Sequence, residues 1–201
     1  MILDVTKERV KRNNYMANIE RLAARNSPRM FHTHTLKEAA IVMGTILSHS
    51  ENTVKIYDHC LNGDISESSY SFYTKLTDFL DNKKTLQVVL RDPQQTDSKI
   101  YHLLTRYAEK FPDQVFLQSI KSEFKNNLET ILPRDTNFIV NDKNAFRLEL
   151  DDRNNSTQSK RVEAICSFNN ELFSKNLNDT FEKLYTNSEP IRKSETLSPN
   201  L

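Results

Sequence analysis

Glycine is scarce in this chain of 201 residues, which has only Gly44 and Gly63. Neither belongs to a GxxxxGKS/T or GxGxxG arrangement, the patterns in which glycine lets the backbone approach a phosphate without a Cβ in the way. The scarcity therefore excludes Walker-type nucleotide hydrolases and typical Rossmann cofactor domains.

Cysteine and long apolar runs are scarce as well. Cys60 and Cys166 do not form a CxxC pair, so reduced structural thiols are favoured over a disulfide framework or a redox site. No window holds the ~18 consecutive apolar residues that a membrane span needs. Charged residues begin at Asp4, which is unlike a signal peptide. We expect a cytoplasmic protein that has no contact with a membrane and carries no cofactor.

Charge is balanced in total but uneven along the chain. The 28 basic and 27 acidic side chains leave a formal charge of +1, which by itself requires neither nucleic acid nor a membrane surface. Seven of the basic residues lie within the first thirty, where only three acidic residues oppose them. With 37% hydrophobic residues, the composition is that of one globular domain with a real core.

The spacing of apolar residues predicts alternating helices and strands. Helical spacing covers residues 4–26 and stops at Pro28, and Thr35 with Glu38 forms a capping box for the next helix. The remaining expected elements are, in order, strands at 30–33 and 53–58, a helix around 69–80, a strand at 86–90, a helix at 100–111, strands at 115–117, 138–140, 145–150 and 163–168, and a helix at 173–184.

This order predicts an α/β fold. Alternation as far as residue 117 favours right-handed crossovers and a mixed, mainly parallel sheet with helices on both faces. The three strands that follow, joined by polar turns, are expected to be antiparallel neighbours. We divide the chain into an N-terminal basic helix at 1–29, an α/β domain at 30–186 and a disordered tail at 187–201.

The second half resembles one half of a phospholipase D-like domain. The resemblance rests on the strand FIVND at 138–142, the strand NAFRLELD at 144–151, a third strand that ends in Phe168-Asn169, and a final helix rich in Leu and Phe. The alternating elements of the first half agree with it. In that family the motif His-x-Lys-x4-Asp supplies a histidine that attacks phosphorus and a lysine that neutralises the phosphoryl oxygens.

The motif is damaged here. Its histidine position falls on Asp135 and its lysine position on Asn137, and only its aspartate is retained, as Asp142. A carboxylate in place of the nucleophile repels a phosphodiester, and an amide carries no charge to clamp it. We therefore expect no catalytic residue at these positions and a pseudoenzyme that serves as a non-catalytic binding or assembly module.

The resemblance also implies a partner. Active relatives combine two copies of the motif in one site, so a single half-domain is expected to form a homodimer or to join another protein. Degenerate domains of this kind suit accessory subunits of nucleic-acid-processing or antiviral defence complexes. That expectation rests on the resemblance alone.

Other residues offer rival sites. Asp58, His59 and Asp92 follow strands predicted to be parallel, and ligands of open α/β sheets bind at that edge. With Asp142 they are candidates for a rebuilt phosphodiesterase or nuclease site. Alternatively, the aspartates cap loops and helices, as aspartates after strands commonly do.

The basic helix and one histidine pair complete the candidates. The helix either follows the phosphates of a nucleic acid through Arg9, Lys11, Arg12 and Arg21, or packs as a solvated arm through Tyr15, Ile19 and Leu22. His32 and His34 lie on one side of a predicted strand, but no further Cys/His cluster accompanies them. We expect no metal site.

Overall fold

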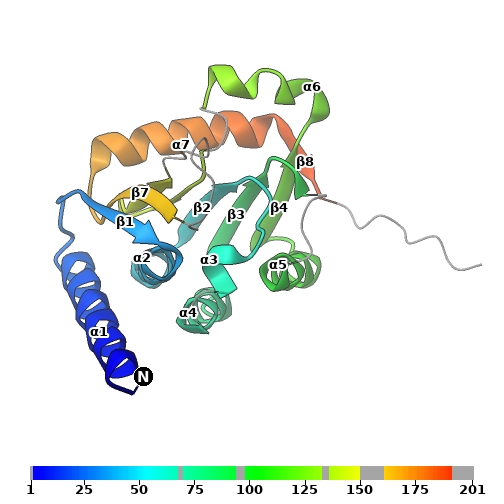
Figure 1. Cartoon of the computed structure of the whole chain (residues 1–201). Coiled ribbons are helices and arrows are strands. Elements are labelled where there is room, and N and C mark those ends of the chain that lie inside the picture. The colour runs from blue at the N-terminus through cyan, green and yellow to red at the C-terminus, as the bar shows by residue number, and fades with distance from the viewer. Residues whose placement is uncertain (1, 68–69, 94–97, 133–135, 150–160, 192–201) are drawn as a thin grey trace, which may run out of the picture.

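The computed structural model describes residues 2–67, 70–93, 98–132, 136–149 and 161–191, in which helices cover both faces of one eight-stranded sheet (Figure 1). The helices are α1 (Ile2–Ala24), α2 (Leu36–His49), α3 (Asp64–Glu67), α4 (Tyr70–Asp81), α5 (Lys99–Lys110), α6 (Ser122–Lys125) and α7 (Glu171–Thr186), with a 3-10 turn at Leu128–Thr130. The strands are β1 (Phe31–Thr35), β2 (Thr53–Asp58), β3 (Thr85–Leu90), β4 (Val115–Ile120), β5 (Phe138–Asn141), β6 (Phe146–Glu149), β7 (Arg161–Ser167) and β8 (Ser188–Pro190).

The sheet runs in the order β1-β7-β6-β5-β2-β3-β4-β8. Only β2–β3 and β3–β4 are parallel among the described pairings, and the other five are antiparallel. The expectation of a mainly parallel sheet is therefore wrong. The α-β alternation did identify the parallel centre, but β5, β6 and β7 extend the sheet from β2 in antiparallel steps, and β1 pairs antiparallel with β7.

Strand β3 is central, as its apolar sequence predicted, because it lies between β2 and β4. Val88 and Leu90 are fully buried on the face that α2, α4 and α5 cover, whereas Val89 belongs to the core beneath α7 (Figure 1). A strand buried on both faces needs apolar side chains at nearly every position. Helices on both faces of the sheet are thus confirmed.

Helix α1 packs beside α2 through its C-terminal half (Figure 1). Ile19 and Ala23 are buried in the larger core, so this half of the basic helix is part of the packed domain. The predicted capping box at the start of α2 is confirmed. The Thr35 hydroxyl accepts from the backbone N–H of Glu38 at 3.2 Å, and the Glu38 carboxylate accepts from that of Thr35 at 3.2 Å.

The expected disordered tail is wrong at its beginning. Ser188–Pro190 forms β8 on the edge of β4, and the backbone N–H of Ile191 continues the pairing to Leu117 at 3.1 Å. Proline fits here because an edge strand has one row of backbone donors without a ladder partner. Residues 192–201 lie outside the described part of the chain. No helix in that described part is long and apolar enough to cross a membrane.

Candidate functional site

Polar side chains gather where β2 and β3 end. Asp58 is the last residue of β2, His59 follows it, and Asp92 comes two residues after β3. Strand β5 runs antiparallel to β2 with Phe138 opposite Tyr57, which brings Asn137 to the same end of the sheet. We call these four residues, together with Lys125 and Glu149, which contact them, the strand-end cluster.

His59, Asp92 and Lys125 form the outer part of the cluster. The His59 Nε2 lies 4.0 Å from the Asp92 Oδ2, and the Lys125 Nζ donates to the Asp92 Oδ1 at 2.5 Å. About a quarter to a third of each side chain is exposed. The sequence placed His59 and Asp92 at the ends of predicted parallel strands as candidates for one site. The sequence did not indicate Lys125, which lies at the end of the short helix α6 after β4.

Asp58 serves the backbone. Its Oδ1 accepts from the N–H of Cys60 at 3.0 Å and from that of Leu61 at 2.7 Å. Leu61 has a φ of 53°, a left-handed conformation that costs free energy for a residue with a branched side chain. The carboxylate stabilises this turn, which is the loop-capping alternative that the sequence left open.

Asn137 connects the outer cluster to a buried inner pair. Its Oδ1 accepts from the backbone N–H of His59 at 2.9 Å, and its Nδ2 donates to the Glu149 Oε2 at 3.2 Å. That oxygen also lies 3.5 Å from Nη1 of Arg147, whose side chain is only 2% exposed. Burial raises the pKa of Glu149, while Arg147 and the bond from Asn137 oppose the shift.

Sequence reasoning missed this inner pair. A signal was nevertheless present, because Arg147 and Glu149 are two apart in the strand sequence FRLE and alternation places them on one face. Opposite charges at that spacing in a strand bounded by apolar residues indicate a buried ion pair. Such a pair needs hydrogen-bonding neighbours, and Asn137 is one of them.

Asp142, the retained motif aspartate, lies at the other end of β5 from Asn137. Its two carboxylate oxygens accept from the backbone N–H groups of Glu51, Asn52 and Thr53 at 2.9, 2.5 and 3.0 Å. The proposed rebuilt site that included Asp142 is therefore wrong, because this carboxylate holds the α2–β2 loop. Asp135 lies outside the described residues.

The remaining candidates are dispersed. On α1, Lys11, Arg12 and Arg21 are exposed, and the side chain of Arg9 is outside the described part. The rings of His32 and His34 stack at 6.1 Å between centroids, and His32 lies 3.8 Å from Glu163. No group of three possible metal ligands occurs among the described residues.

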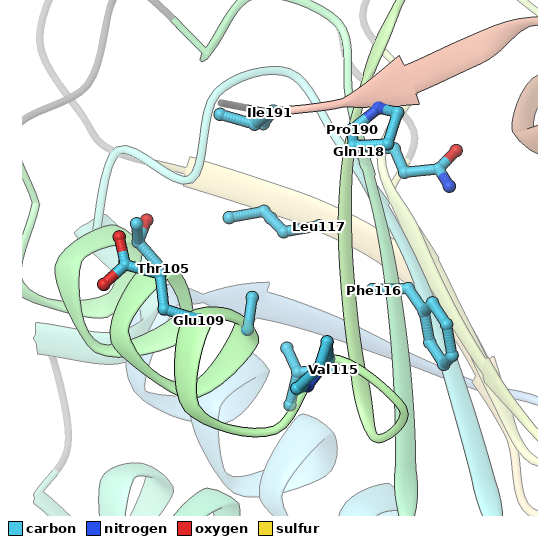
Figure 2. Close-up of a pocket in the computed structure, with 10 residues that line it drawn as sticks. Thr105, Glu109, Val115, Phe116, Leu117, Gln118, Pro190 and Ile191 are labelled. Carbon is cyan, nitrogen blue, oxygen red and sulfur yellow. The ribbon is translucent and has the colours of Figure 1, made fainter. Parts of the chain in front are cut away.

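A pocket of about 390 Å³ lies elsewhere, between α5 and the first half of β4. Thr105 and Glu109 of α5 face Leu117 and Ile191 across it (Figure 2). The pocket is bounded mainly by apolar atoms, and none of the residues that line it is a histidine, lysine or arginine. It opens beside the beginning of β4, whereas Asp92 and Lys125 follow the ends of β3 and β4. Its lining offers no group for phosphodiester chemistry.

Comparison with solved structures identifies the fold. Nuc from Salmonella typhimurium, a phospholipase D family member, has a TM-score of 0.57 at 7% identity and covers 82% of this chain and 99% of its own. NucT from Helicobacter pylori has a TM-score of 0.54 at 10% identity, covering 81% of this chain and 100% of its own. The archaeal chromatin protein TrmBL2 has a TM-score of 0.56 at 13% identity over 94% of this chain.

The chain therefore has the phospholipase D-like fold, as the order of its elements predicted. It spans 65% of the length of TrmBL2. Neither protein-family profiles nor curated proteins match the sequence itself.

Proposed function

We propose that the protein is a non-catalytic phospholipase D-fold domain that serves as a binding or assembly subunit. The proposal is based on the residues at the motif positions, Asn137 and Asp142, whose polar groups form hydrogen bonds within the domain. Both ends of the Asn137 amide are bonded within the domain, and the Asp142 carboxylate accepts three backbone donors. These groups now hold strands and loops in place.

The charges of the strand-end cluster support the same proposal. A phosphodiester that approaches His59 meets the Asp92 carboxylate, and like charges at a few ångströms repel. Lys125 already pairs with Asp92. Arg147 is buried and already pairs with Glu149. The phosphate clamp that the family takes from its lysine is thus replaced by groups that are neutral or already paired.

A diverged phosphodiesterase is the second candidate, and the contact between His59 and Asp92 favours it. A carboxylate beside an imidazole orients the ring and stabilises the positive charge that the ring gains when it attacks phosphorus. Lys125 would neutralise part of the negative charge that a bound phosphodiester brings to this site.

Turnover assays separate the two candidates. The purified protein is incubated with a chromogenic phosphodiester, single- and double-stranded DNA, and phospholipid vesicles, with and without divalent metal. The proposal predicts no hydrolysis. His34→Ala is the matched control, because it removes an exposed imidazole from β1. Hydrolysis that is lost in His59→Ala and kept in His34→Ala would establish the second candidate. Activity that survives both changes identifies a contaminant.

Assembly with a second copy is the further part of the proposal. The resemblance implies that relatives build one site from two motif copies, and Nuc and NucT match this chain over 99% and 100% of their own lengths. Sedimentation equilibrium from micromolar to millimolar concentration tests the homodimer. A monomer over the whole range would contradict self-association.

A further inference from the structure

Helix α1 carries a straight row of basic and amide side chains on its outward face. The row, which we call the α1 stripe, consists of Lys11, Asn14, Asn18, Arg21 and Arg25, and all five are exposed. The steps of three and four residues match the helical repeat and keep the row within a sector of roughly 90°. Ile19 and Ala23 lie on the opposite side, buried against the domain.

The stripe separates the basic residues that the sequence had grouped. Lys11 and Arg21 belong to it, whereas Arg12 lies about 100° from Lys11 around the helix. Along the row, the Arg21 Nη2 donates a hydrogen bond to the Asn18 Oδ1 at 2.8 Å. Among the described residues, no carboxylate forms an ion pair with Lys11, Arg21 or Arg25.

Among the described side chains of α1, the one carboxylate is engaged elsewhere. Glu20 lies on another side of α1 and pairs with Lys75 of α4 at 3.7 Å. Arg21 and Arg25 are one turn apart, a spacing at which like charges destabilise a helix. An extended anionic ligand would remove that repulsion and would meet three cations along about 21 Å of helix.

The chemistry of the stripe selects among anionic ligands. It has no exposed aromatic side chain on which unpaired bases can stack, since Tyr15 faces the domain and its hydroxyl is buried. The row itself has no apolar residue, and beside it Val10 is the one large apolar side chain of α1 that is exposed among the described residues, which is too little for the hydrophobic seam of a partner helix. A double-stranded nucleic acid needs neither feature, because its regular phosphates bind cations and its base edges accept amides.

The placement of α1 fits a duplex in one further respect. The helix lies along the side of the domain, and its N-terminal half continues beyond the sheet (Figure 1). A helix fits the wide major groove of B-form DNA but not the deep, narrow groove of duplex RNA. We propose that the α1 stripe binds double-stranded DNA in the major groove, with Lys11, Arg21 and Arg25 on phosphates and Asn14 and Asn18 toward base edges.

Fluorescence anisotropy with a labelled 25-base-pair DNA duplex tests the proposal on the full chain. Three neutralised phosphates give a slope of log K against log salt of about −3. The combined change Lys11→Gln, Arg21→Gln and Arg25→Gln is expected to weaken binding on the order of 100-fold at 50 mM salt and to remove most of that slope. Circular dichroism confirms that the variant is folded.

A matched control removes the same charge elsewhere. The combined change Lys110→Gln, Lys175→Gln and Lys183→Gln takes three exposed cations from α5 and α7. This control is expected to keep both affinity and slope. Equal loss in both triple variants would show that binding depends on net charge, and would overturn the assignment to α1.

Two more comparisons test the groove and the amides. Asn14→Ala with Asn18→Ala is expected to lower affinity a few-fold, reduce any preference among DNA sequences and leave the salt slope unchanged. Duplex RNA or single-stranded DNA bound as tightly as duplex DNA would overturn the major-groove proposal. Competition by poly-glutamate at equal charge, or no binding at 50 mM salt, would overturn the nucleic-acid proposal as a whole. None of these outcomes depends on whether the strand-end cluster is catalytic.

Discussion

Replacing Asp142 is expected to destabilise the domain without affecting any chemistry. Its carboxylate accepts three backbone donors from the loop between α2 and β2. Hydrogen bonds to a charged group contribute about 1.5–3 kcal/mol each. The loop donors of Glu51 and Asn52 lie in exposed residues, so water replaces part of that loss. We expect Asp142→Ala to lower the free energy of unfolding by about 2 kcal/mol.

Urea unfolding followed by circular dichroism measures this loss. With a denaturant slope of about 2 kcal/mol/M, the midpoint falls by roughly 1 M. Amide hydrogen exchange should quicken at residues 51–53 before it quickens in β3, because the loop loses its anchor first. Asp113→Ala, which removes an exposed carboxylate in the turn before β4, is the matched control and should leave the midpoint within a few tenths of its value. An unchanged midpoint in Asp142→Ala would refute the anchoring role.

Two further changes test the core and the buried pair. Val88→Ala, in the fully buried central strand β3, should lower the free energy of unfolding by about 2–4 kcal/mol, measured by the same urea titration. A loss below about 1 kcal/mol would argue against tight packing around Val88. Burial raises the pKa of Glu149 above its unfolded value, so the native state binds this proton more tightly and the carboxyl's contribution to stability falls as pH rises from about 4 through the raised pKa. The stability of Glu149→Gln relative to the native protein should therefore be more favourable at pH 7 than at pH 4, and a difference independent of pH would contradict the shift.

Local patterns predicted the parallel centre of the fold. Helical spacing and apolar strands identified α2, α4, α5 and β2 to β4, because the spacing of apolar residues within each element reflects which of its faces is buried. The pairing of β1 with β7 is different, since its register joins Phe31 to Cys166. No local spacing encodes a contact between residues so far apart in the sequence. The expectation of a mainly parallel sheet applied the pattern of the first half to the whole chain.

The candidate site was predicted in part for a similar reason. Asp58, His59 and Asp92 were expected at strand ends and lie there, but their roles depend on their neighbours, several of which come from later in the chain. Lys125 arrives through α6, and Asn137 arrives with β5. Asp142 was recognised through the family motif, yet its role as an anchor depends on three backbone donors about ninety residues earlier. Side-chain identity cannot reveal such partners.

The pairing of β1 with β7 also constrains the order of events during synthesis. Strands β2, β3 and β4 with their helices are complete once residue 120 has been made, whereas β1 has no neighbour until 161–167 follow. At roughly 5–20 residues per second, β1 waits on the order of ten seconds for its partner strand. During that interval the nascent chain carries an open strand, and its exposed His32 and His34 keep one face polar. A ribosome that pauses before residue 161 would prolong this state and give β1 time to pair with another chain.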